Sequence, residues 1–205
     1  MISVQFSDGI SVISLNRPDK ANALTPEMLE ALHAEVDAAT ERADRALILT
    51  GTGKVFSAGA DLDAAKAGLA TSPLWDRLSG ALAAAPMLTI TALNGTLAGG
   101  AFGMALACDL RLAVPGARFF YPVMRLGYLP QPADPPRLAA LVGPARAKMI
   151  LMAGQKIGAD EALAWGLIDR ISPPETLLDD ARALAADALA ASPAHVAGIK
   201  AMIPG

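Results

Sequence analysis

The sequence predicts an α/β domain with a largely parallel sheet and a helical C-terminal region. Short segments rich in β-branched residues alternate with longer helical patterns, which is typical of parallel strands joined by helices. Segment 46–50, ALILT, is wholly apolar, as expected of a strand covered on both faces. Hydrophobic residues make up 53% of the 205 residues and charged residues 18%, so the chain can bury a sizeable core.

The N-terminal part reads as two strands and a helix. Strands are expected at 2–6 and 10–15, around the turn Ser7-Asp8-Gly9. Thr25 then caps a helix whose first position is Pro26. Its apolar face is expected to carry Leu29, Leu32 and Val36.

The middle of the chain alternates between loops, helices and buried strands. After the strand at 46–50, residues 51–62 are expected to form a loop, and a helix follows Ser72-Pro73. Segment 87–93 is a short β-branched strand that ends at the turn Asn94-Gly95, and a buried helix comes next.

The last part is predicted to become increasingly helical. Two further strands are expected at 110–114 and 118–121, followed by a proline-rich loop at 126–136. Helices are then expected over four segments: 144–154, 159–166, 175–191 and 194–202.

Composition and spacing argue against several functions. The net charge of −3, without a run of Lys or Arg, disfavours a nucleic-acid partner. Pro86 and Asn94-Gly95 divide the uncharged stretch after Arg77, so a membrane span is not expected. The single Cys108 and the absence of a signal-peptide pattern favour the cytoplasm. No spacing matches a P-loop, a dinucleotide fingerprint, a serine-hydrolase elbow or a metal site.

Two glycine-bearing segments follow predicted strands. They are FSAGADL at 56–62 and TLAGGAFG at 96–103, and each stands where a strand gives way to a helix. Free backbone N–H groups at such a point favour negative charge, and two of them together could hold an oxyanion. Tight helix–strand packing would explain the same glycines equally well, so both interpretations stay open.

Five ordered stretches resemble the crotonase, or enoyl-CoA hydratase/isomerase, superfamily. They are RPDKANALTPEM, FSAGADL, NGTLAGGAFGMALACDLRLA, F-PVMRLGYLP and AWGLIDRI, which together cover nearly the whole chain. The resemblance implies a crotonase-like (ClpP-like) spiral of ββα units at 1–172 and a C-terminal helical segment at 173–205, shortened relative to the family. It also implies acyl-CoA ligands, a homotrimer or hexamer, and no metal or cofactor besides coenzyme A.

The resemblance also assigns site residues. The oxyanion donors would be the backbone N–H groups of Ala58 and Gly100, which hold a thioester carbonyl while an enolate forms. The coenzyme A contacts it implies are Lys20, Ala21, Ala23, Ala58, Gly59, Ala60, Asp61, Leu62 and Gly100.

The sequence departs from the family at its acid–base positions. Hydratases of the family carry glutamates where this chain has Gly103 and Val123, and other members carry an acid or tyrosine at the position of Gln131. Substitute groups are Asp134 and Tyr128 in the following loop and Tyr121 before Pro122. Gln131 could orient substrate or water but cannot accept a proton.

Two functional hypotheses remain. One is an enzyme that forms an acyl-CoA enolate and performs isomerisation, decarboxylation, hydrolysis or weak hydration, within fatty acid metabolism as a lyase or isomerase. The other is a non-catalytic acyl-CoA-binding or assembly subunit. Because an intact oxyanion hole serves little purpose in a pure binder, the enzyme is favoured.

Overall fold

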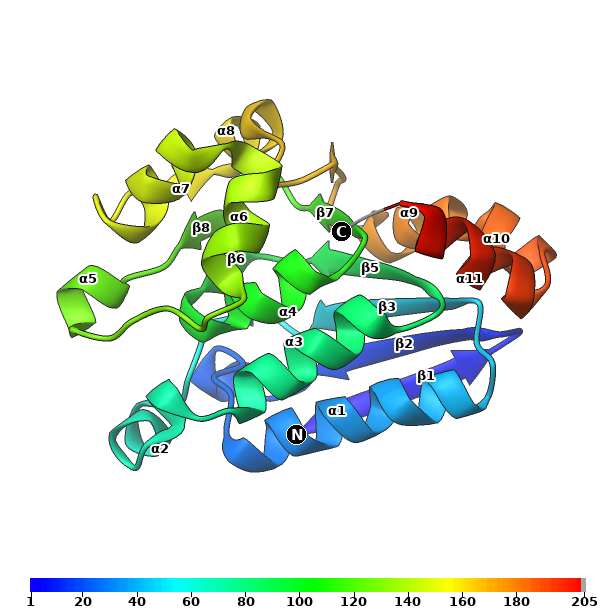
Figure 1. Ribbon diagram of the computed structural model, residues 1–205, viewed down its shortest axis with the longest axis horizontal. Helices are drawn as coiled ribbons and strands as arrows, with labels where there is room; N and C mark the ends of the chain where they lie inside the picture. The colour runs from blue at the N-terminus through cyan, green and yellow to red at the C-terminus, as the bar shows by residue number, and fades with distance from the viewer. Residues whose placement is uncertain (204–205) are drawn as a thin grey trace.

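The structure is a computed structural model that describes residues 1–203, and it contains two sheets surrounded by helices (Figure 1). In the larger sheet, of order β1-β2-β3-β5-β7-β10, only the β1–β2 pair is antiparallel. Its strands are β1 (Ile2–Ser7), β2 (Ile10–Leu15), β3 (Ala46–Gly51), β5 (Leu88–Leu93), β7 (Leu110–Ala113) and β10 (Arg170–Ile171). The predicted α/β architecture with a largely parallel sheet is therefore confirmed.

A smaller sheet of order β4-β6-β8-β9 positions the two glycine-bearing segments. Its strands are β4 (Val55–Ser57), β6 (Thr96–Ala98), β8 (Arg118–Phe120) and β9 (Ile157–Gly158). The first three strands are parallel, so their carboxyl ends lie at one edge of the sheet.

The longer helices lie along the larger sheet and around the smaller one (Figure 1). They are α1 (Pro26–Glu41), α3 (Leu74–Ala84), α6 (Asp134–Val142), α7 (Pro144–Leu151), α8 (Ala159–Trp165), α9 (Leu177–Leu184) and α11 (Pro193–Met202). The shorter helices are α2 (Leu62–Lys66), α4 (Phe102–Ala107), α5 (Val123–Leu126) and α10 (Ala186–Ala190). Single 3₁₀ turns occur at η1 (Pro18–Lys20), η2 (Leu69–Thr71) and η3 (Gly99–Ala101).

Local sequence signals account for the best-predicted elements. The Thr25 hydroxyl accepts a hydrogen bond from the Met28 N–H at 3.3 Å, which caps α1 as predicted. The apolar face of α1 is buried, and β3 is buried over residues 46–50. No helix in the described part of the chain has the length and apolar character that crossing a bilayer requires.

The predicted loops contain short elements that periodicity does not reveal. Segment 51–62 holds β4, and β6 lies between the Asn94-Gly95 turn and the next helix. The proline-rich loop holds α5, and α6 begins at Asp134 because Pro135 and Pro136 occupy its first turn, where no backbone donor is needed. Elements of three or four residues are too short for a repeat to be seen.

Candidate functional site

The two glycine-bearing segments meet at the carboxyl edge of the smaller sheet. A Cβ at Gly59 would lie 2.9 Å from the carbonyl oxygen of Ala98 and 3.3 Å from the Cα of Gly99. Gly59 also has a φ of +90°, which side chains rarely adopt. The backbone segments after β4 and β6 are therefore in direct contact, and Gly59 is required for both reasons.

Hydrogen bonding separates the free from the engaged N–H groups of the first segment. The N–H of Ala58, predicted as an oxyanion donor, instead donates to the carbonyl of Ala21 at 3.0 Å. Leu24 donates to the carbonyl of Gly59 and accepts from the N–H of Asp61, each at 2.8 Å. This parallel bridge directs the N–H of Ala60 away from Leu24. The Ala60 N–H has no acceptor among residues 1–203. The bond to Ala21 counts against Ala58 as a donor and leaves Ala60 available.

The second segment also offers an N–H group. Gly100 is the second residue of η3, and the first N–H groups of a helical turn have no acceptor within it. The side chain of Trp75 packs on Gly100, since a Cβ there would lie 3.2 Å from three atoms of the indole ring. The indole N–H donates to the carbonyl of Leu69 at 2.7 Å, which fixes the ring over η3.

A buried carboxyl lies beside the position where hydratases of the resembling family carry a glutamate. A Cβ at Gly103 would lie only 2.8 Å from Oδ1 of Asp134, which is 1% exposed. The Tyr121 hydroxyl donates to the other oxygen, Oδ2, at 2.9 Å. Oδ1 has no hydrogen-bond partner in the described residues. The missing side chain at 103 thus leaves the space that the Asp134 carboxyl fills.

The surroundings of Asp134 raise the pKa of its carboxyl above that of an aspartate in water. Burial raises the pKa of Asp134 to about 7, although the Tyr121 hydrogen bond opposes this. The charge of Asp76 raises the pKa further and that of Arg137 lowers it. The pKa of Tyr121 is raised, chiefly by burial, so its hydroxyl stays a donor. A carboxyl with a pKa near neutrality can both accept and donate protons.

Two other predicted candidates have different surroundings. The side-chain amide of Gln131 donates to the carbonyl of Ala70 at 3.0 Å, and the backbone carbonyl of Gln131 accepts from the Asp134 N–H. Gln131 therefore joins the loop before α6 to the η2 turn. Tyr128 is 40% exposed in the segment after α5, and it is Tyr121, not Tyr128, whose hydroxyl bonds Asp134.

The segments predicted to bind coenzyme A lie side by side. Asn22 is buried, and its amide donates to the carbonyls of Thr52 and Val55 at 2.9 and 2.8 Å. This bonding fixes the Lys20–Ala23 loop against β4, where Ala21 meets Ala58. Asn22 was not singled out by the sequence, and its place before an alanine-leucine pair gave no signal.

The end of this segment is shaped by one aspartate. Asp61 caps α2 by accepting from the N–H groups of Asp63 and Ala64. It also pairs with Arg17 at 2.7 Å, and this bond holds the pKa of Asp61 below its usual range. Leu62, the next predicted contact, is largely exposed.

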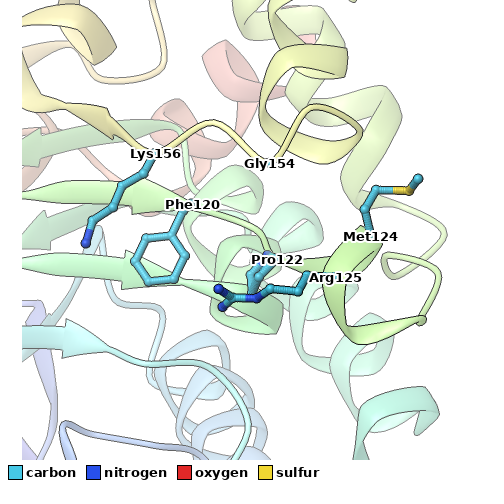
Figure 2. Close-up of a pocket in the computed structure, with 6 residues that line it drawn as sticks. All are labelled: Phe120, Pro122, Met124, Arg125, Gly154 and Lys156. Carbon is cyan, nitrogen blue, oxygen red and sulfur yellow. The ribbon is translucent and has the colours of Figure 1, made fainter.

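A pocket lined by two cationic side chains, Arg125 and Lys156, opens at the end of β8 (Figure 2). It has a volume of about 380 Å³ and is lined by Phe120, Pro122, Met124, Arg125, Gly154 and Lys156. The Lys156 ammonium lies 4.9 Å from the centre of the Phe120 ring. Among residues 1–203, no three His, Cys, Asp or Glu side chains are grouped as metal ligands.

Solved structures of similar proteins identify the fold class of this chain. A solved enoyl-CoA hydratase/isomerase from Pseudoalteromonas atlantica superimposes with a TM-score of 0.91 at 30% identity, covering 98% of this chain and 81% of that one. The enoyl-CoA hydratase of Bacillus anthracis gives 0.90 at 32% identity, covering 97% and 80%. The fold is therefore the crotonase fold, as the resemblance implied.

Sequence comparison gives the family itself. Residues 5–204 match the enoyl-CoA hydratase/isomerase family, and the chain belongs to it. A protein of Mycobacterium leprae named a probable enoyl-CoA hydratase is 35% identical, covering 94% of this chain and 78% of its own. A 4-chlorobenzoyl coenzyme A dehalogenase of an Arthrobacter species is 33% identical, covering 97% and 75%. The family is enzymatic, but its members differ in reaction.

Replacing Gly59 by alanine is expected to destabilise the protein. The new methyl group would collide with the Ala98 carbonyl, and the positive φ adds backbone strain, which together cost about 1–3 kcal/mol. Urea unfolding measures the loss. Gly116→Ala is the control, because a Cβ there meets nothing within 4 Å; equal stability of the two variants would contradict the close contact.

Proposed function

We propose that this protein is an acyl-CoA enzyme that transfers a proton at a carbon next to the thioester. The observation that carries the proposal is the unpartnered Oδ1 of Asp134 against Gly103. Gly103 lies three residues after Gly100, hence about one helical turn from it on the same side of the segment. A carboxyl base beside an oxyanion donor is what enolate chemistry requires.

The proposed roles follow from the chemistry of a thioester. The N–H groups of Ala60 and Gly100 would hold the carbonyl oxygen, and negative charge would grow there as the α-proton leaves. Asp134 would accept that proton on Oδ1, while the Tyr121 hydroxyl holds the other oxygen in place. An oxyanion donor contributes about 10²–10³-fold and a positioned base about 10²–10⁴-fold.

A proton-transfer reaction fits these residues better than the addition of water. Water addition by the family's hydratases relies on two glutamates, and neither Gly103 nor the buried Val123 can act as one. One base that takes a proton and returns it at another carbon suits isomerisation. The Lys20–Ala23 loop and segment 58–62 would bind coenzyme A, and no metal takes part in the proposed chemistry.

Deuterium exchange tests this function directly. The protein is incubated in D₂O with butanoyl-, hexanoyl- and phenylacetyl-CoA, and mass spectrometry follows deuterium at the α-carbon. Exchange above the uncatalysed rate supports the proposal. Binding of all three thioesters without exchange would overturn it in favour of a non-catalytic acyl-CoA-binding protein.

The exchange rate is expected to rise with pH and to level off above neutrality. Asp134 acts as a base only when ionised, and its pKa of about 7 keeps it protonated in acid. The rate should be half-maximal near that pH and fall about tenfold for each pH unit below it. A profile that is flat between pH 5 and about 8 would exclude Asp134 as the base.

A further inference from the structure

Three buried polar atoms on α3 and α6, the helices that pack against α4, lack partners in the described residues. They are Oδ1 of Asp134, Oδ1 of Asp76 and Nη1 of Arg137. A buried polar atom without a hydrogen bond is costly, and bound water commonly supplies about three such bonds. Two carboxylate oxygens and one N–H donor match the two hydrogens and the lone pairs of a water molecule.

The helices bring these groups to the same site. Asp76 follows Trp75, whose ring packs on Gly100, and Asp134 packs on Gly103, so the start of α4 lies between α3 and α6. Arg137 stands one turn after Asp134 on α6. The charge of Asp76 also raises the pKa of Asp134 and of Tyr121, which agrees with this arrangement of α3 and α6.

The two carboxyls differ in access to solvent. Asp134 is 1% exposed, whereas Asp76 lies on the first turn of α3 and is only half-buried. A proton taken up by Asp134 therefore has no direct route to solvent. Asp76 is therefore the more solvent-accessible of the two carboxyls.

We propose that Asp76 is a positioning residue that exchanges the proton of Asp134 with solvent through a water molecule held by Asp76, Asp134 and Arg137. The inference rests on the proposed function. In the outward step, the O–H bond of the protonated Asp134 breaks as its proton passes to the water. The water releases another proton to the Asp76 carboxylate, which gives it to solvent; the inward step is the reverse.

The test separates proton transfer within the site from exchange with solvent. The protein converts 3-hexenoyl-CoA to 2-hexenoyl-CoA in D₂O, and the rate and the deuterium content of the product are measured together. In Asp76→Asn, isomerisation is expected to stay within about threefold, while deuterium incorporation falls at least about tenfold, because the substrate's own proton is returned. Asp76→Glu should restore incorporation.

Controls and outcomes keep this inference distinct from the proposed function. Asp160→Asn, an exposed acid in the first turn of α8, should change neither quantity. Unchanged deuterium content of the product in Asp76→Asn would overturn the role of Asp76. An equal fall of the isomerisation rate and the deuterium content would do the same. Neither result would affect the proposed function. A wild-type protein without isomerisation or α-exchange would overturn the proposed function, and this inference with it.

Discussion

Asp134→Asn is expected to lower α-proton exchange by about 10²–10⁴-fold, with acyl-CoA affinity nearly unchanged. The amide keeps an oxygen that can accept the Tyr121 hydroxyl, so the buried geometry is preserved while the base is removed. Exchange in D₂O measures the rate, and calorimetric titration with hexanoyl-CoA measures affinity. Undiminished exchange in this variant would place the base elsewhere.

The same variant is expected to be more stable than the wild type in alkaline solution. The pKa of Asp134 is raised from 3.8 to about 7 in the fold, so its stabilising contribution is complete below pH 3.8 and is lost as the pH rises through about 7. Asparagine does not ionise and escapes this loss. Urea unfolding at about pH 8 should favour the variant, and the difference should shrink in acid. Lower stability at both pH values would indicate structural damage instead.

Gly103→Ala is expected to abolish most of the exchange without removing any reactive group. The added methyl group would stand 2.8 Å from Oδ1 of Asp134, so the carboxyl must move from its place beside residue 103. Misplacing a base costs about as much as losing it, here about 10²-fold, and overpacking a buried site costs about 1–3 kcal/mol. Exchange and urea unfolding report the two effects separately.

A second helical glycine provides the matched control. Gly80 lies in α3 with nothing within 4 Å of a Cβ, so Gly80→Ala should retain exchange and stability. If Gly103→Ala exchanged protons as fast as Gly80→Ala, the carboxyl would not depend on the glycine. A glutamate introduced at 103 would also collide with the Asp134 carboxyl, so Gly103→Glu should not by itself create a hydratase.

Local sequence signals were sufficient for the elements whose stability is local. The Thr25 cap and the apolar strand 46–50 were predicted because each depends on residues next to it. The β6 strand and the start of α6 at Asp134 were missed, since three residues give no period and prolines suggested a loop. Domain boundaries and subunit assembly stay predictions.

The site residues likewise differ in whether they could be predicted from local sequence or only from the fold. The family motif predicts Gly100 as a donor, and this stays a prediction. The choice between Ala58 and Ala60 depends on the carbonyl of Ala21, which sequence spacing does not locate. Asp134 was one of several acids and tyrosines until the fold placed it on Gly103. Asp76 gave no signal at all, because only packing of α3 brings it to the cluster.

The hydrogen bond between Gln131 and Ala70 has a consequence for the timing of the proposed reaction. It joins the loop before α6 to the η2 turn, and the Asp134 carboxyl that follows this loop has almost no exposed surface. In the proposed reaction, a thioester would reach Asp134 only after this loop moves. Association should then proceed in two steps, a fast encounter followed by a slower opening that does not depend on ligand concentration. The observed binding rate would level off as acyl-CoA increases, and the plateau would report how often the loops separate.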